Sequence, residues 1–503
     1  MRRQRTIVSL YLLGVAVVAA GPGCGGSVLL GVENSSSSST GASGSASGGG
    51  ALAGGSGASG IGGVSIGSAS SSVPPTADAT TAKVTATGDA SSDDSAACSP
   101  SATQCSGGGV ETCDSDGRWG SPWPCATGEC TNNACAGSTN TGASCAQSGP
   151  GLTLCSFGGT GTGPSESCCT SPEVPGGGPT VLAGFSWYSS TTTLTGYRLD
   201  KYLVTAGRFH VYVDYLANGG APPADGSGKH THVNGGQGLI DIGNSDGGVS
   251  YESGWDAADW NAEIATGPGA ADTWSTNLTS CGADNSTWTD APTTATESYL
   301  PINCVNWYEA YAFCIWDGGF LPTQSEWRYA AAGGSQQREA PWTTGFLSGA
   351  PLGNAHSTNY AIWDCDYGYG QPWPPSANCP GQSALPFIAP VGLATLGAGR
   401  WGQLDLVGEV MEWTLDWSLS LNQVSLPPDS GYLDPCVDCA VLSVPPAGDE
   451  GTPEGDSGQP PWRVLEGGLF NSGLADYMNS EYSTNAGPTA RDAGIGFRCA
   501  MTP

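Results

Sequence analysis

Two short helices joined by a glycine turn constrain the fold of this chain more than any other stretch of its sequence. They are predicted between residues 300 and 334, and each begins with a capping box, in which the cap and the residue three positions on exchange hydrogen bonds. Asn306 with Glu309 forms the first box, and Thr323 with Glu326 forms the second. A glycine pair ends each helix, Gly318-Gly319 and Gly333-Gly334. Two capped helices this close must pack on something, so the rest of the chain is expected to fold over the pair.

A third helix is predicted after Thr205, which can cap it. Its apolar positions follow at helical spacing: Phe209, Val213 and Leu216. Gly219-Gly220 closes the segment. By contrast, residues 218–298 and 335–400 show little periodicity and are expected to be long loops. Tryptophans scattered through both stretches indicate that these loops pack down on the domain.

Acidic residues outnumber basic ones in this chain of 503 residues, with 45 Asp plus Glu against 15 Lys plus Arg and a formal net charge of −30. A surface this acidic repels phosphate backbones, which excludes nucleic acid as a partner. Glycine supplies 79 residues, so part of the chain is not expected to pack into a core. Such acidity is typical of exported proteins, which it keeps soluble outside the cell.

The N-terminus has the pattern of a bacterial signal peptide, residues 1–24. Arginines precede an apolar run from Ile7 to Ala20, which is too short to span a bilayer. A small residue before Cys24 is similar to a lipoprotein cleavage site, although Gly21 departs from the usual leucine. We therefore expect an exported protein of the cell envelope, at the outer membrane or cell surface, with a lipid on Cys24 as its membrane anchor. The other 18 of the 19 cysteines are an even number and can all pair in an oxidising compartment.

Residues 25–97 contain no Phe, Tyr or Trp and consist mainly of Ser, Gly, Ala and Thr. Such a segment cannot bury enough apolar surface to offset the entropy lost on ordering, so a disordered linker is predicted. As a flexible coil it would span about 5–6 Å times the square root of its length, which suits a tether for the later domains. A tail without function is the alternative.

Residues 98–137 form a small disulfide-rich module with six cysteines: Cys98, Cys105, Cys113, Cys125, Cys130 and Cys135. Three disulfides would replace a core that is too small to hold itself. A hairpin-like turn is indicated at Asp114-Ser-Asp-Gly117. Zinc binding is the alternative, but these cysteines contain no Cys-x-x-Cys pair. A connector, residues 138–174, carries four more cysteines: Cys145, Cys155, Cys168 and Cys169.

Four ordered motifs carry a resemblance to a known family. The helix pair comes first, and the later motifs are Gly408-Glu-Val-Met-Glu412-Trp-Thr-Leu-Asp416-Trp417, Arg463-Val-Leu-Glu-Gly467-Gly468 and Gly496-Phe-Arg-Cys499. The segment 175–503 thus resembles the sulfatase-modifying factor domain, the fold of the formylglycine-generating enzymes. The resemblance implies an α+β fold of the C-type-lectin-like class with much irregular loop.

The family's active members hold Cu(I) between two thiolates and use oxygen to oxidise a substrate cysteine. Aligning on Gly467-Gly468 places Ser472 and Tyr477 at those two cysteine positions, and Leu469 where the active enzymes keep a serine. No cysteine lies between Cys439 and Cys499. Hydroxyl and phenol oxygens are hard ligands that cannot replace paired thiolates for Cu(I), so copper is not expected.

The resemblance also implies a structural calcium site. Its ligands would be the side chains of Asp405 and Glu412 and the backbone carbonyls of Gly408 and Val410, with Glu409 in place of the usual Asn. A loop with a glycine bend can turn such oxygens inward, and Ca²⁺ accepts flexible oxygen cages. A solvated acidic turn is the alternative. A second family calcium site would use Asn359 and the carbonyl of Tyr360, although its partner carboxylate has no clear match near Ser383.

Three further sets of residues could form disulfides or bind a metal. The resemblance implies a disulfide between Cys314 and Cys499 that closes the helix pair onto the C-terminus. Cys436-Val-Asp-Cys439 has the spacing of a redox motif, but no βαβ pattern surrounds it, which favours structural pairing. His230-Thr-His232 is a possible metal pair, with only His210 and His356 as further histidines.

These observations predict an exported protein whose family-like domain lacks copper chemistry and serves as a ligand-binding or assembly module. The expected partner is an extracellular peptide or glycan that its aromatic-rich loops would contact. The competing hypothesis is a copper oxidase that makes formylglycine in exported sulfatases, and a purely structural surface protein is a third.

Overall fold

The residues that the computed structural model describes all lie in one compact unit of the chain, Asp89–Pro503. They comprise short pieces of 98–135 and then 142–155, 166–181, 191–243, 248–291, 295–343, 358–369, 383–418, 436–443, 462–472, 479–480 and 482–503. The predicted signal peptide with Cys24 and the linker 25–97 lie outside the described residues. In the described ranges, no helix has both the length and the apolar character that crossing a bilayer requires.

The small module contains five short strands: β1 (Thr103–Ser106), β2 (Gly109–Thr112), β3 (Trp123–Pro124), β4 (Cys130–Thr131) and β5 (Ala134–Cys135). β1, β2 and β3 form one antiparallel sheet, and β4 pairs with β5. A disulfide joins Cys105 to Cys130, and Cys98 is also disulfide-bonded. Disulfide bonding is thus confirmed for these three cysteines.

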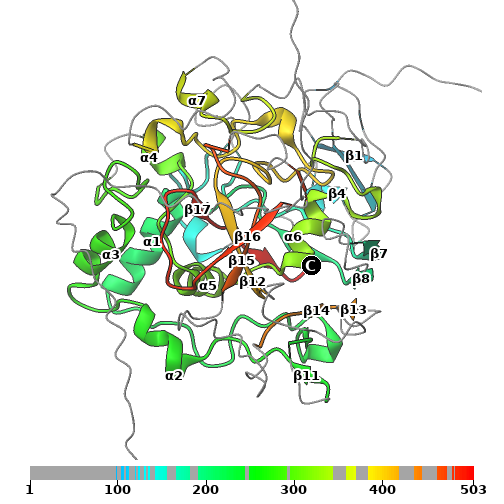
Figure 1. Ribbon diagram of the computed structural model, residues 1–503, viewed down its shortest axis with the longest axis horizontal. Helices are drawn as coiled ribbons and strands as arrows, with labels where there is room; N and C mark the ends of the chain where they lie inside the picture. The colour runs from blue at the N-terminus through cyan, green and yellow to red at the C-terminus, as the bar shows by residue number, and fades with distance from the viewer. Residues whose placement is uncertain are drawn as a thin grey trace, which may run out of the picture. The chain divides into compact units, whose positions relative to one another are not determined.

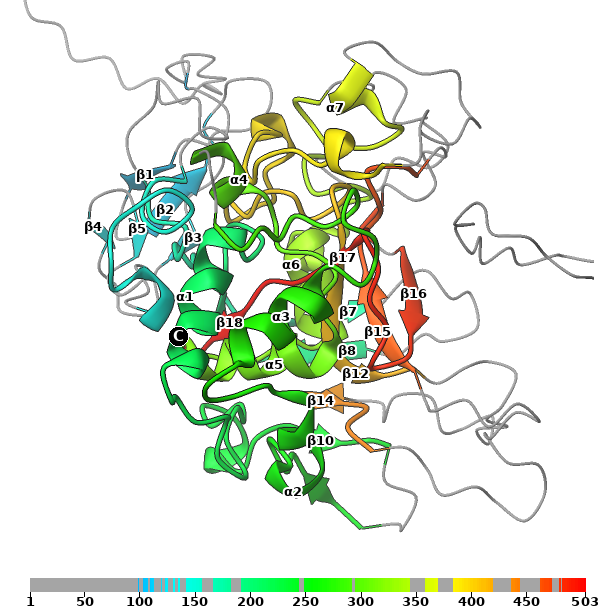
Figure 2. The same cartoon turned by 90° about the vertical axis from the view of Figure 1, so that its left-hand side faces the viewer.

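The largest sheet has four strands in the order β16-β15-β12-β17. Their bounds are β12 (Met411–Trp417), β15 (Arg463–Glu466), β16 (Ser483–Ala486) and β17 (Ile495–Gly496). β12 runs antiparallel to β15, with Trp413 opposite Leu465, and parallel to β17. Both neighbouring sides of β12 are therefore covered, and all of its residues but the last are buried. Figure 1 shows β12 and β15 beside helices α5 and α6, and Figure 2 shows β16 at the outer edge of the sheet.

Three smaller sheets, each of three strands, surround it in the orders β13-β8-β7, β18-β9-β6 and β11-β10-β14. Their bounds are β6 (Glu173–Val174), β7 (Gly177–Val181), β8 (Thr191–Leu194), β9 (Tyr197–Leu199), β10 (Ile240–Asp241), β11 (Ser250–Tyr251), β13 (Cys436–Val437), β14 (Cys439–Ala440) and β18 (Ala500–Met501). β9 pairs antiparallel with β18, so the start and the end of the domain share one sheet. Phe320 bridges to Ala500 and ties the turn between the two central helices to the same place.

The two capped helices form as the sequence predicts. α5 (Trp307–Trp316) and α6 (Gln324–Ala331) each begin with a complete capping box. α1 (Ala206–Ala217) is capped by Thr205, whose side chain accepts a hydrogen bond from the amide of Arg208. These caps satisfy backbone donors that a helix leaves unpaired at its start. The family-like part thus has the α+β organisation that the resemblance implies.

The expectation of long loops over 218–298 and 335–400 is wrong in part. The structure places α2 (Ala257–Trp260), α3 (Ala270–Leu278) and α4 (Ala295–Tyr299) in the first stretch and α7 (Asp366–Tyr369) in the second. α3 buries one stripe, Ala270, Trp274 and Leu278, at a spacing of four residues. That stripe is a helical signal, but α3 is short, and the side chains of α1 that cover it are distant in sequence.

Aromatic side chains fill the interior between α1, α3 and α5. The ring of Phe209 stacks on Phe313 with centroids 5.5 Å apart, and Trp274 meets Phe209 edge-on at 5.6 Å. Phe497 closes the group from the C-terminal segment, 5.5 Å from Phe313. Offset and edge-on pairs of this kind stabilise a core by about 0.5–1.5 kcal/mol beyond the area that they bury. The core therefore joins all three helices to the end of the chain.

Disulfides cross-link the domain at several points: Cys145–Cys169, Cys155–Cys168, Cys281–Cys304, Cys314–Cys499 and Cys436–Cys439. The bond from Cys314 of α5 to Cys499 spans 185 positions and is the pairing that the family resemblance implies. Cys436 and Cys439 are bonded to each other.

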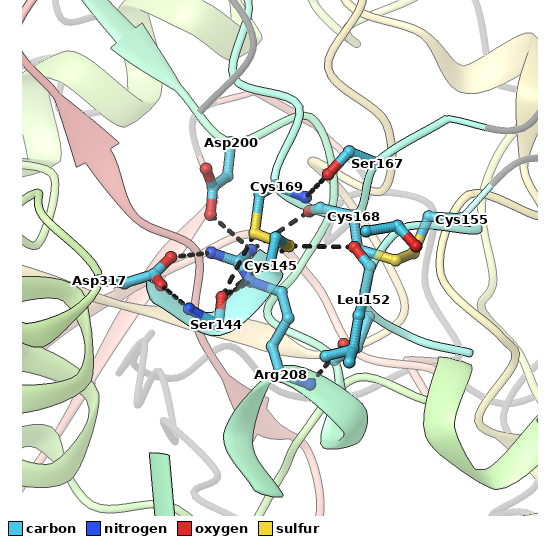
Figure 3. The surroundings of a disulfide bond; sticks show 12 residues. Ser144, Cys145, Leu152, Cys155, Ser167, Cys168, Cys169, Asp200, Arg208 and Asp317 are labelled. Carbon is cyan, nitrogen blue, oxygen red and sulfur yellow. Dashed lines mark hydrogen bonds and ion pairs between the residues drawn. A yellow bond between two sulfur atoms is a disulfide. The ribbon is translucent and has the colours of Figure 1, made fainter. Parts of the chain in front are cut away.

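A buried network of ion pairs and hydrogen bonds binds the connector to the domain (Figure 3). Arg208 of α1 donates to the carboxylates of Asp200 at 2.8 Å and Asp317 at 2.7 Å, and all three side chains are fully buried. The same guanidinium donates to the hydroxyl of Ser144 and to the carbonyl of Cys168. Burial lowers the pKa of Arg208, but the two carboxylates outweigh it and raise the pKa. The connector is thus held through hydrogen bonds to a charge at the centre of the domain.

Candidate functional site

Leu469 and Ser472, two of the three residues at active-site-equivalent positions, form a local turn. The amide of Leu469 donates to the hydroxyl of Ser472 at 3.0 Å, and the amide of Ser472 donates back to the carbonyl of Leu469 at 3.0 Å. Ser472 is buried, and Leu469 packs partly on the main core. Tyr477 lies outside the described residues. The hydroxyl of Ser472 is therefore engaged in holding the turn closed.

Cys365 lies beside this turn in the backbone hydrogen-bond network. The amide of Cys365 donates to the carbonyl of Phe470 at 2.8 Å, and the amide of Asp364 donates to that of Ser472 at 3.2 Å. Cys365 is buried and disulfide-bonded. Every cysteine side chain that the structure describes is in a disulfide, so within this part of the chain no thiolate is available for a soft metal.

The loop predicted to bind calcium follows a tight, left-handed path. Asp405, Gly408 and Glu409 all have positive φ, at 55°, 81° and 64°. A side chain at Gly408 would meet the carbonyl of Ile362 at 2.6 Å, which requires glycine there. The two non-glycine residues are each strained, and such strain persists only where the surroundings impose it. The left-handed backbone of this loop therefore determines where the side chains of Asp405 and Glu409 are placed.

Glu412, at the start of β12, forms a bidentate ion pair with Arg498. Nε of Arg498 donates to one carboxylate oxygen at 2.7 Å and Nη2 to the other at 2.8 Å. The same Nη2 also donates to the backbone carbonyls of Leu404 and Asp405 at 3.0 Å. Burial raises the pKa of Glu412, and Arg498 opposes this rise. Both oxygens of this predicted ligand are thus already engaged by a guanidinium.

Two other carboxylates of the loop face one short segment, residues 389–392. The amide of Gly392 donates to Oδ2 of Asp405 at 2.6 Å, and the amide of Ala389 donates to Oε1 of Glu409 at 2.7 Å. The second oxygen of Glu409, Oε2, is buried and has no hydrogen-bond partner. Burial raises the pKa of Asp405 to about 6 and that of Glu409 well above its usual value.

The donor set of this loop fits a hard cation. The carboxyl groups of Asp405, Glu409 and Glu412 are all buried; that of Glu412 is paired with Arg498, and one oxygen of Glu409 has no hydrogen-bond partner. In the part of the chain that the structure describes, no three His, Cys, Asp or Glu side chains converge as a metal site. A cation bound here would therefore need backbone carbonyls as well as carboxylates, the ligand mixture that Ca²⁺ accepts.

Asn359 and Tyr360 lie in a separate turn. The carbonyl of Asn359 accepts a hydrogen bond from the amide of Leu396 at 2.7 Å, and the ring of Tyr360 lies 5.8 Å from that of Trp342. The turn continues to Ile362, whose carbonyl accepts the amide of Glu409 at 2.7 Å. The two predicted calcium sets thus occupy neighbouring loops.

His230, one of the two histidines proposed as a metal pair, is held between two carboxylates. Its Nδ1 lies 3.0 Å from Glu252, and its Nε2 lies 3.2 Å from Glu326, the capping residue of α6. Its ring also packs on Phe320 at 3.7 Å between centroids. Burial lowers the pKa of His230, but the two carboxylates raise it to about 10. A doubly hydrogen-bonded imidazolium has no lone pair for a metal, so this histidine is a structural cation.

The domain combines an α+β fold, a capped helix pair and an acidic loop ahead of the central strand. A comparison with known families identifies the class of protein that has these features. The sulfatase-modifying factor enzyme 1-like domain matches residues 169–503, and the chain belongs to that family. The match confirms the resemblance drawn from the four motifs.

Individual relatives include catalysts and an inactive protein. The formylglycine-generating enzyme of Mus musculus is 35% identical over 117 residues, 23% of this chain and 27% of that protein. That of Thermomonospora curvata is 27% identical over 326 residues, 62% of this chain and 84% of that protein. The inactive C-alpha-formylglycine-generating enzyme 2 of Mus musculus is 31% identical over 115 residues, 23% of this chain and 32% of that protein. The chain thus spans about a quarter of the length of the mouse enzyme that it matches.

Proposed function

We propose that this domain is a non-catalytic member of its family and works as a ligand-binding or assembly module of an exported protein. The observation that carries the proposal is the turn at Leu469 and Ser472, which presents a hydroxyl engaged in a backbone hydrogen bond where the copper enzymes need a thiolate. An alcohol is a hard, weakly acidic ligand, whereas Cu(I) prefers soft sulfur donors.

The state of the cysteines supports the same proposal. The sequence has no cysteine between Cys439 and Cys499, and Cys499 is bonded to Cys314. Cys365, the neighbour of the Ser472 turn, is also in a disulfide. Oxygen-dependent oxidation of a substrate thiol on copper would require two reduced sulfurs at one place. An inactive relative among the similar proteins gives a precedent for loss of activity in this family.

Export is supported by the number of disulfides, because such bonds persist in oxidising compartments. In this proposal a lipid on Cys24 anchors the protein in the cell envelope, and residues 25–97 tether the domain. The ligand would be an extracellular peptide or glycan. Trp462 and Tyr251, both exposed, are aromatic groups of the kind that contact such ligands.

The competing hypothesis, a formylglycine-generating oxidase, is tested by direct turnover. The purified protein would be loaded with Cu(I) and incubated in air with a peptide that contains Cys-Thr-Pro-Ala-Arg, and the peptide would be analysed by mass spectrometry. We expect the thiol to remain intact. Conversion of the cysteine to an aldehyde, detected by its mass and by reaction with a hydrazine, would overturn the proposal.

A matched pair of variants tests whether missing thiolates are the reason that the protein does not bind Cu(I). Ser472→Cys supplies one sulfur, and Ser472→Cys combined with Tyr477→Cys supplies two. We expect only the double variant to retain Cu(I) against a competing chelator, because a single thiolate is a weak site. Retention of Cu(I) by the wild-type protein at a thiol would contradict the proposal.

A further inference from the structure

The acidic loop offers a carboxylate that the family resemblance does not assign to calcium. We propose that Glu409, together with Asp405, supplies the carboxylates of a calcium site in this protein, and that Glu412 is withheld from the cation by Arg498. The proposal concerns a structural cation and does not depend on whether the domain is catalytic.

Glu412 is unsuited to the role because both of its oxygens are committed. Arg498 binds them in a fork at 2.7 Å and 2.8 Å, and both side chains are buried. This geometry satisfies the charge of the carboxylate in full. Arg498 also donates to the carbonyl of Asp405, which places a positive group at the side of the loop that faces β12. A divalent cation there would be repelled by the guanidinium.

Glu409 has the opposite character. Only 1% of it is exposed, one oxygen accepts the amide of Ala389, and the other has no partner among the described residues. A buried carboxylate oxygen without a partner is costly, so its presence points to a missing positive group or a proton. The backbone of Glu409 is also left-handed, a strained conformation that directs this side chain inward next to a glycine.

Asp405 and Glu409 are brought together by the segment that binds them. Ala389 and Gly392, the donors of the two amide hydrogen bonds, are three positions apart, so the two amides that bind the carboxylates are separated by at most about 11 Å. A cation between the two carboxylates would be attracted by both.

Calcium fits this environment better than a transition metal does. The available ligands are carboxylates and backbone carbonyls, which are hard oxygen donors. The irregular loop can supply the remaining oxygens at the variable distances that Ca²⁺ tolerates, whereas Mg²⁺ requires a regular octahedron. The two carboxylates would match the charge of one divalent ion.

The test uses the full-length protein and terbium luminescence, in which Tb³⁺ replaces Ca²⁺ and is excited through nearby tryptophans. We expect Tb³⁺ to bind the wild type and to be displaced by Ca²⁺. Glu409→Gln should weaken Tb³⁺ binding by about tenfold or more, because the site loses one of two charged ligands. Glu412→Gln should leave the affinity within about threefold of the wild type.

Thermal unfolding provides a second readout that separates the two carboxylates. Without Ca²⁺, Glu409→Gln should melt at or above the wild-type temperature, since an amide can never place a charge at this buried position, and Ca²⁺ should no longer raise its melting temperature. Glu412→Gln should melt lower but keep the Ca²⁺ response. No binding by the wild type, unchanged binding by Glu409→Gln, or loss of binding in Glu412→Gln would each overturn the proposal. If Glu412→Gln does not fold, the Glu409→Gln result decides alone.

Discussion

The guanidinium of Arg463 lies flat on the indole of Trp417, with Cζ 3.4 Å from the centroid of the ring. The indole of Trp307 covers the opposite face at 3.6 Å, and Nη1 donates to the carbonyl of Leu415. This buried cation is therefore held mainly by two aromatic faces. It joins β15 to β12 and to the first residue of α5.

We expect Arg463→Lys to lower the free energy of unfolding by about 2 kcal/mol or more, measured by urea denaturation. An ammonium cannot stack between two planar rings, and a desolvated cation–π contact is worth about 2 kcal/mol. Arg400→Lys is the matched control, since Arg400 lies over Trp401 at 5.4 Å and is only half-buried. It should cost about 1 kcal/mol or less. Equal losses of unfolding free energy in the two variants would show that stacking between two rings does not stabilise the protein more than a single, half-buried contact.

Because His230 is a buried imidazolium, we expect the free energy of unfolding to fall at alkaline pH. Its pKa is raised from 6.5 to about 10 by Glu252 and Glu326 against the effect of burial. The folded state therefore holds this proton more tightly than the unfolded state. The resulting stabilisation is complete below pH 6.5 and is lost as the pH rises towards 10.

Chemical denaturation between pH 6.5 and 9.5 would measure this effect. We expect the wild type to lose a few kcal/mol across the interval, and His230→Gln to start lower and show a flatter profile. His210→Gln is the control, because burial lowers the pKa of His210 and so this residue does not hold its proton more tightly in the folded state. A wild-type profile as flat as that of His230→Gln would refute the assignment of the charge.

The long disulfide is expected to stabilise the domain far more than the short one. Cys314–Cys499 closes a loop of 185 positions, whereas Cys436–Cys439 closes one of three. By loop-closure entropy the first is worth roughly 5 kcal/mol and the second roughly 2 kcal/mol. Paired Cys→Ser variants compared by calorimetry would test this. The idea fails if removal of the short bond is the more damaging.

Removal of the buried charge at Arg208 should release the connector. We expect Arg208→Met to lower stability by about 3–5 kcal/mol, because Asp200 and Asp317 would remain buried without a cation. Hydrogen exchange of the amides in 142–155 should accelerate at the same time. Lys201→Met removes an ion pair to Glu166 that is partly exposed, and it should cost about 1 kcal/mol or less. Unchanged exchange in Arg208→Met would contradict this role for the network.

The helices were predictable where their signals are local. The capping boxes at Asn306 and Thr323 each depend on residues three positions apart, and both form as the sequence indicates. The short helix α3 was missed because the tertiary packing of Trp274 decides its formation.

In the candidate site too, the sequence indicates local relationships but not contacts between residues that are distant in the chain. The family resemblance points to Asp405 and Glu412 in one acidic loop, because both lie within a single short segment of the sequence. It does not show that Arg498, 86 positions away, engages both oxygens of Glu412. Nor does it show that the segment 389–392 turns Glu409 inward. Such pairings arise from the folded arrangement and leave no periodic pattern.

The pairing of β9 with β18 has a consequence for how the polypeptide acquires its structure. Tyr197–Leu199 can pair with β6 on one side as soon as they are made, but their partner on the other side, Ala500–Met501, is synthesised some 300 positions later. The early part of the domain must therefore remain incomplete during translation, and its assembly should be slow and post-translational. A chain with such a late closing step would depend on chaperones to protect its unpaired strands.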